Sequence, residues 1–298
     1  MKIKSRFTAL ALGLAGGVLS ATQTQAVLTS YSPGDLFIGF RQTGASNTLL
    51  VNIGQASLYS PASLGGTAGT TPFNVQFGLV PNTLTPVFNL NDDLVDTFGA
   101  NWAANPGNGT GVRWAVVGFT DNSLDNTPTA GLTARSIYIT KARTNPAVQS
   151  ATLGSVNHDT FSGNFQSLIY GGATSYDGRN STDNSTEAYI GAASGASNWN
   201  TLIGANGSFG LGASRRVEQA ASGLYSGPTD SVLDLYLAPN ADSTLATSNT
   251  YLGSFSLSSS GVLTFTPVPE PSTALLLAIS GTAIMAFRRR NRSVPSAG

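Results

Sequence analysis

The chain has 298 residues and a mass of 30.6 kDa, and only 10% of its residues are charged, against about 25% in an average soluble domain. Residues 27–267 contain 8 basic and 14 acidic side chains, which argues against nucleic-acid binding because that function needs a concentrated positive surface. There is no cysteine, so a disulfide scaffold, a thiolate metal site and cysteine catalysis are excluded.

The start of the chain has the three parts of a secretory signal peptide. A basic beginning is followed by an apolar stretch that ends at Leu19 and by small, polar residues that end at Ala26. The basic residues are Lys2, Lys4 and Arg6. The apolar stretch is short for a membrane span and has no polar face, so an N-terminal anchor or an amphipathic helix fits it less well. We therefore expect signal peptidase to cut after Ala26 and the chain to be exported.

The body of the chain has the pattern of a mainly β protein. Short apolar or alternating runs recur between turns rich in Gly, Pro, Asn, Ser and Thr. The run 114–119 is continuously apolar and predicts a central strand covered on both faces, and the turn at 258–261 predicts a closing hairpin. The alternation along 231–237 predicts one buried face. The predicted strands cover residues 36–41, 48–53, 73–80, 112–120, 135–141, 231–237, 251–257 and 262–266.

Two short helices are expected within this body. Asn91 is placed to cap a helix whose first turn carries two aspartates, where the helix dipole favours negative charge. Leu94, Phe98 and Trp102 fall on one apolar stripe of this helix. A second, weaker helix is expected within residues 197–203.

The strands and helices predict one β-sandwich-like domain. Residues 173–230 are rich in Ser, Asn, Gly and Ala, and we interpret them as surface loops of that domain, since a linker there would force strands to pair across the gap. The predicted organisation is a signal peptide at residues 1–26, a β-rich domain at 27–267 and a C-terminal segment at 268–298.

The sequence contains little that indicates nucleophilic catalysis. His158 is the single histidine, and Ser155 and Asp159 lie near it in the chain. A Ser-His-Asp triad needs a spatial arrangement that adjacency in sequence does not supply, so we interpret His158 as a surface residue. We expect a protein that is not an enzyme and has no cofactor.

Carboxylates gather at two places in the body. Asp92, Asp93 and Asp96 are interpreted as compensation of the helix dipole. A second, oxygen-rich group leaves a calcium site open as an alternative, although its spacing is not that of an EF-hand. Its members are Asp177, Asp183 and Glu187, interleaved with Asn180 and Asn184. We assign no metal site to either group.

Aromatic side chains offer a surface on which sugar rings stack. Trp102 and Trp114 fall within buried-looking patterns and are expected in the core. Trp199 and Tyr176 lie among polar residues, and these two are the candidate glycan contacts.

The C-terminal segment has three parts in a fixed order. Pro269, Glu270 and Pro271 come first, then an apolar run over 273–287, and finally a basic cluster. As a helix the run spans about 23 Å, less than the ~30 Å hydrocarbon core of a bilayer, so it predicts a weak transmembrane anchor. The basic cluster consists of Arg288, Arg289, Arg290 and Arg292, which stay on the cytoplasmic side and retain the helix in the membrane.

This tail resembles the PEP-CTERM sorting signal, which exosortases recognise in Gram-negative bacteria that make extracellular polysaccharide. The alternative is an ordinary membrane anchor behind a proline-rich linker. The resemblance implies a transient stay in the inner membrane, a cut near the Pro-Glu-Pro motif, and release of the body or its transfer to the cell surface. Residues 34–41, 49–54 and 251–255 are similar to segments of other PEP-CTERM proteins of unassigned function, which implies no activity.

Three functions are weighed on these grounds. The first is a non-enzymatic surface or matrix protein of the exosortase pathway, associated with exopolysaccharide or a biofilm. The second is a lectin-like module that binds polysaccharide through Trp199 and Tyr176. The third is a secreted hydrolase that uses buried carboxylates.

Overall fold

A computed structural model describes most of the strand-forming part of the chain. The described residues are 34–61, 64, 66–80, 85–104, 111–120, 136–143, 149, 156–157, 161, 188–192, 199, 203, 219–220, 231–239, 245–246 and 249–268. The predicted signal peptide with Ala26, the Pro-Glu-Pro motif and the arginine cluster lie outside these residues, as do His158 and Tyr176.

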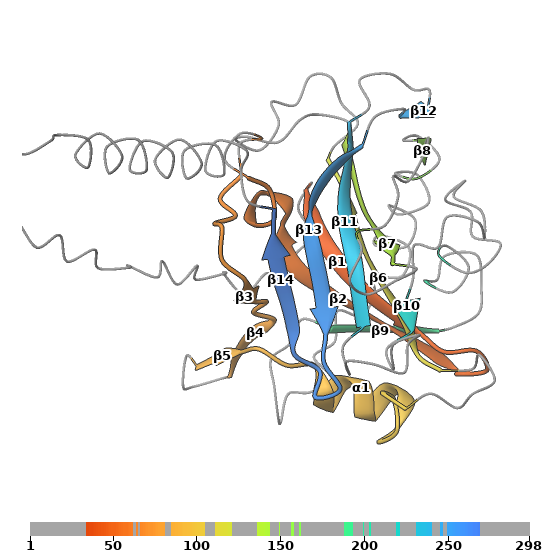
Figure 1. The fold of residues 1–298 in the computed structure, drawn as a ribbon. Helices are drawn as coiled ribbons and strands as arrows, with labels where there is room; N and C mark the ends of the chain where they lie inside the picture. Colours follow the sequence, from red (N-terminus) through yellow and green to blue (C-terminus); the bar gives the residue numbers. More distant parts are fainter. Residues whose placement is uncertain are drawn as a thin grey trace, which may run out of the picture.

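Ten strands of the described residues form one antiparallel sheet (Figure 1). Their order across it is β3 (Phe73–Asn74), β14 (Leu263–Pro267), β13 (Thr250–Leu257), β11 (Ser231–Pro239), β7 (Ser136–Ala142), β6 (Arg113–Phe119), β1 (Asp35–Arg41), β2 (Asn47–Gln55) and β9 (Ala188–Ala192), while β10 (Gln219–Ala220) pairs with β6. Strands from both ends of the described chain therefore belong to the same sheet.

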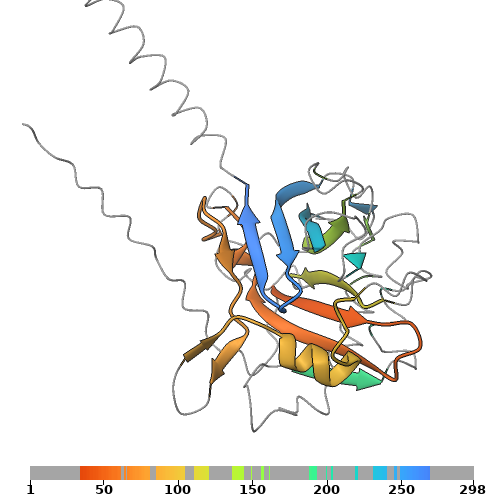
Figure 2. The same ribbon diagram turned by 60° about the horizontal axis from the view of Figure 1, so that its bottom comes forward.

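Smaller elements accompany this sheet. The described residues also form the pairs β4 (Gly78–Val80) with β5 (Thr85–Val87) and β8 (Val156–Asn157) with β12 (Leu245–Ala246). A 3-10 turn, η1 (Ala56–Leu58), follows β2, and the helix α1 (Asn91–Phe98) lies across one end of the sheet. Figure 2 shows the β4–β5 hairpin projecting beside α1.

The sheet is curled, so β13 and β14 pass over β1 and β2 with an apolar core between them (Figures 1 and 2). Tyr59, just after η1, belongs to this core and packs against β13 and β14. Its ring centroid is 5.2 Å from that of Phe255 on β13 and 5.1 Å from that of Phe265 on β14. The prediction of a mainly β fold is confirmed. The ten strands of the main sheet, however, form one curled sheet and not the two stacked sheets of a sandwich.

The central strands are buried on both faces. Along β6, Trp114 and Val116 belong to the core inside the curl, while Ala115 and Val117 belong to a second core on the outer face. The prediction of a doubly covered central strand at 114–119 is confirmed. The buried face predicted along β11 is confirmed, and on the outer face Asp234 is 0% exposed as well.

The predicted strands agree with the observed ones, with one exception. The region 73–80 divides into β3 and β4, because residues 75–77 are buried without lying in a strand. The closing hairpin is confirmed, since β13 and β14 pair from Leu257 and Leu263 onward. The short strands β5, β8, β9, β10 and β12 were not predicted; they are two to five residues long.

The helix α1 differs from its prediction at both ends. Asn91 is the first helical residue and not the cap, which is Leu90, and Asn89 Oδ1 accepts a hydrogen bond from the Asn91 backbone N–H at 3.4 Å. The Asn91 side chain instead accepts a hydrogen bond from Trp102 Nε1 at 3.2 Å. Trp102 lies beyond the helix, yet it is buried as expected.

Of the second predicted helix, only Trp199 and Ile203 are described. Both have helical backbone and both are buried in the outer core. Within the described part of the chain, no helix combines the length and the apolar composition that a membrane crossing needs. The predicted span at 273–287 lies outside that part.

Candidate functional site

The junction between the sheet and the Pro-Glu-Pro motif is the first candidate site. β14 ends at Pro267, which pairs with Gly253 of β13. The next residue, Val268, donates a backbone hydrogen bond to Leu252 at 3.1 Å and is the last described residue. Pro269 follows directly in the sequence, so the motif begins immediately after the last hydrogen bond of the described part of the sheet.

Trp199 is not the surface residue that the sequence indicated. Its side chain is 0% exposed and belongs to the outer core with Phe161 and Ile203. The indole lies so close to Gly39 of β1 that a Cβ there would be 2.2 Å from its Cε2 atom. A ring enclosed in this way presents no face to a sugar, so the expected glycan contact at Trp199 is wrong.

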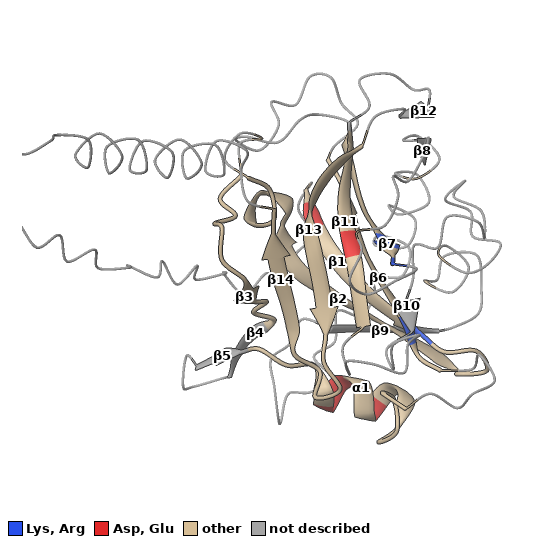
Figure 3. Cartoon of the chain, in the orientation of Figure 1, with Lys and Arg blue, Asp and Glu red and all other residues tan. Residues whose placement is uncertain are grey.

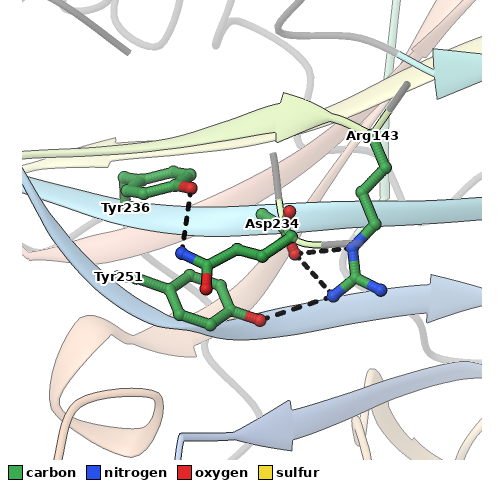
Figure 4. A network of polar contacts seen from close by, with 5 residues as sticks. Arg143, Asp234, Tyr236 and Tyr251 are labelled. Carbon is green, nitrogen blue, oxygen red and sulfur yellow. Dashed lines mark hydrogen bonds and ion pairs between the residues drawn. The ribbon is translucent and has the colours of Figure 1, made fainter. Parts of the chain in front are cut away.

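A buried ion pair crosses the outer face of the sheet (Figure 4). Asp234 on β11 is 0% exposed, and Arg143, directly after β7, is 15% exposed. Arg143 Nε donates to Asp234 Oδ1 at 2.9 Å, and Nη2 lies 2.7 Å from the same oxygen. The pair therefore joins β11 to the end of β7.

Two tyrosines extend this network. Arg143 Nη2 donates to the Tyr251 hydroxyl of β13 at 3.4 Å, and Gln149 Nε2 donates to the Tyr236 hydroxyl at 3.3 Å. The two tyrosine rings lie 5.5 Å apart. The network thus connects β7, β11 and β13 through side chains in addition to the backbone ladder.

The electrostatics of this network keep its two charges paired. Burial lowers the pKa of Arg143, but the hydrogen bond and the charge of Asp234 outweigh this and raise it above its usual value. Burial, followed by the negative charge of Asp234, raises the pKa of Tyr251. Both shifts favour a charged Arg143 and a protonated Tyr251, an arrangement suited to cross-linking strands.

A second buried carboxylate, Asp35, lies at the start of β1. It is 0% exposed and accepts hydrogen bonds from Asn52 Nδ2 at 3.0 Å and from Gln55 Nε2. Sequence reasoning missed the burial of Asp35 and Asp234, although Asp234 alternates with apolar residues inside its strand and Asp35 directly precedes an apolar run. That position is the signal that identifies them.

A further group of acids lies on α1, drawn red in Figure 3; Asp92 and Asp96 are exposed, whereas Asp93 is buried. Asp92 and Asp93 lie in its first turn, as expected. No group of three or more metal-ligating side chains occurs among the described residues. The predicted oxygen-rich loop at 177–187 lies outside them.

Comparison with known proteins identifies the tail. Residues 267–291 match the sequence model of the PEP-CTERM protein-sorting motif. The chain carries this sorting motif. No curated protein and no solved structure matches the chain.

The PEP-CTERM motif indicates export, membrane sorting in a Gram-negative bacterium and processing by an exosortase. Its matched region begins at Pro267, inside β14, so the motif and the sheet share Pro267 and Val268. In this chain the folded body and the sorting signal therefore overlap at Pro267 and Val268.

Proposed function

We propose that this protein is an exported, non-enzymatic component of the cell surface or extracellular matrix, delivered by the exosortase pathway and associated with exopolysaccharide. The match of residues 267–291 to the sorting motif carries this proposal. A signal peptide cleaved after Ala26 starts export, and the arginines at 288–292 hold the tail in the inner membrane until processing.

The composition of the body supports this role. Few side chains are charged, and 29 of the residues at 27–267 are glycine. Abundant Ser, Thr and Asn provide hydrogen-bonding groups suited to a hydrated polysaccharide layer. The lectin-like alternative is less well supported, because Trp199, one of its two proposed contacts, is buried.

The processing step breaks one backbone amide near the Pro-Glu-Pro motif. Water, or a nucleophile of a surface acceptor, bonds to the carbonyl carbon and its proton goes to the departing amine. The first outcome releases the body, and the second attaches it to the surface.

The test is the intact mass and terminal sequence of the protein recovered from the envelope and the medium. We expect a species that begins near Val27 and ends close to Pro269. A species that retains residues 273–292 would contradict exosortase processing. Glu270→Ala, or deletion of residues 288–292, is expected to leave the uncut precursor in the inner membrane, and normal release of either variant would contradict the role given to the tail.

A further inference from the structure

The residues just before the Pro-Glu-Pro motif belong to the sheet. Thr266 pairs with Ser254, Pro267 with Gly253, and Val268 bonds to Leu252. A protein-cleaving enzyme needs several residues of extended chain on either side of the bond that it cuts, and paired backbone is not accessible to it. On the side of the body, the residue directly before the motif is Val268, which is itself hydrogen-bonded to the sheet.

At Gly253 the backbone of β13 lies very close to the end of β14. Gly253 has φ +150°, and a Cβ there would lie 2.4 Å from the Thr266 carbonyl oxygen and 3.0 Å from the Pro267 Cα. The register of β13 also shifts beside Gly253, where it pairs with β11. Glycine at this bulge lets β14 approach closely enough for the last backbone bond to form.

The same strand end has few bonds to lose. Backbone hydrogen bonds join Ser258 to Val262 and Val268 to Leu252. Hydrogen-bonded and non-hydrogen-bonded pairs alternate along an antiparallel ladder. In this register Gly253 and Pro267 are therefore a non-hydrogen-bonded pair. On its other edge, β14 pairs with β3 only at Thr264 and Phe265. Residues 266–268 can therefore detach while the aromatic core beneath β14 stays in place.

We propose that residues 266–268 serve both as the last rungs of the sheet and as the segment that the exosortase binds, so that the fraction of molecules in which they have left β13 sets the rate of processing. This inference rests on the proposed function. When a paired segment opens and closes quickly, the cutting rate follows the population of the open form. The β13–β14 end thus controls how long the precursor stays in the membrane.

The experiment measures the half-life of the precursor in the producing bacterium by pulse labelling. Inserting Gly-Ser-Gly-Ser between Val268 and Pro269 leaves the sheet intact and supplies free chain. We expect processing about tenfold faster, the factor that one net backbone hydrogen bond contributes to an equilibrium. An unchanged or slower rate would overturn the proposal, because the enzyme would then accept the closed sheet.

Gly253→Ala provides a second, independent variant. Its methyl group collides with the Thr266 carbonyl oxygen, the Phe265 ring and Pro267, so it loosens the strand end without altering the motif. We expect faster processing in the natural chain and no further gain in the chain with the insertion. A gain of equal size in both backgrounds would contradict the proposal.

Two controls separate the possible failures. Gly44→Ala places alanine at another positive φ, +83°, where no atom lies within 4 Å, and it should leave the rate unchanged. A gain as large as that of Gly253→Ala would assign the effect to general strain and overturn the proposal. Glu270→Ala should block processing in every background. If it blocks processing while the insertion has no effect, only this inference fails, whereas normal processing of Glu270→Ala refutes the proposed function itself.

Discussion

Replacing Gly39 with alanine is expected to destabilise the body through a collision with Trp199. The new Cβ would lie 2.2 Å from Trp199 Cε2 and 2.4 Å from Cδ2 and Cζ2. Because β1 and the indole are both fully enclosed, the ring has to move. Overpacking of this kind costs about 1–3 kcal/mol. In a body of this size, a loss of about 2 kcal/mol lowers the melting temperature by roughly 4–8 °C.

A double-mutant cycle isolates this contact. Trp199→Ala alone should cost about 3–5 kcal/mol, as expected for the truncation of a buried tryptophan. In that background the methyl group of Gly39→Ala enters the space that the ring has left. The double variant should therefore be less destabilised than the sum of the two single variants by about 2 kcal/mol.

The assay is urea unfolding of the mature protein recovered from the producing cells, followed by far-ultraviolet circular dichroism. Gly69→Ala is the matched control, because no atom lies within 4 Å of the position that a Cβ would take there, and it should change the free energy of unfolding by less than about 0.5 kcal/mol. Strictly additive costs in the cycle would refute the packing of Trp199 against Gly39.

Two further predictions concern buried polar groups. Arg143→Met removes the counter-charge of the fully buried Asp234 and should cost about 3 kcal/mol, whereas Asp234→Asn leaves the charge on the partly exposed Arg143 and should cost less; the opposite order in urea unfolding would contradict the role of the pair. Burial raises the pKa of Tyr138 to about 12. The unfolded chain then loses this proton first as the pH rises, so the contribution of Tyr138 to stability is constant below about pH 10 and falls by roughly 2–3 kcal/mol toward pH 12. Tyr138→Phe should remove most of that loss, and an unaltered pH profile in this variant would show that another group causes it.

The strands were predictable where a local pattern determines burial. The apolar run in β6 is long enough to need cover on both faces, and the structure provides it. The region 73–80 is also rich in apolar residues, but it divides in two, because Phe73 pairs with Phe265 near the other end of the body while Gly78–Val80 pair with β5. Apolar composition therefore predicts burial, while strand pairing depends on distant partners.

The candidate site was predictable only at the tail. The order of its three parts is a local property, and the family comparison confirms the sorting motif. Trp199 has polar neighbours in the sequence, and its burial depends on the absent Cβ of Gly39 on another strand. The Arg143–Asp234 pair spans 91 residues, so no short sequence window contains both partners.

The position of β14 has a consequence for how the body folds. Thr264 Oγ1 donates to Asn74 Oδ1 across 190 residues of chain, and β14 also covers Tyr59 in the core. Such a high contact order slows folding, because the early strands wait for a late one. For a chain that crosses a membrane from its N-terminus, the sheet closes only after residue 267 has emerged. The body therefore stays incompletely folded, and able to pass through a translocation channel, until the sorting signal reaches the membrane.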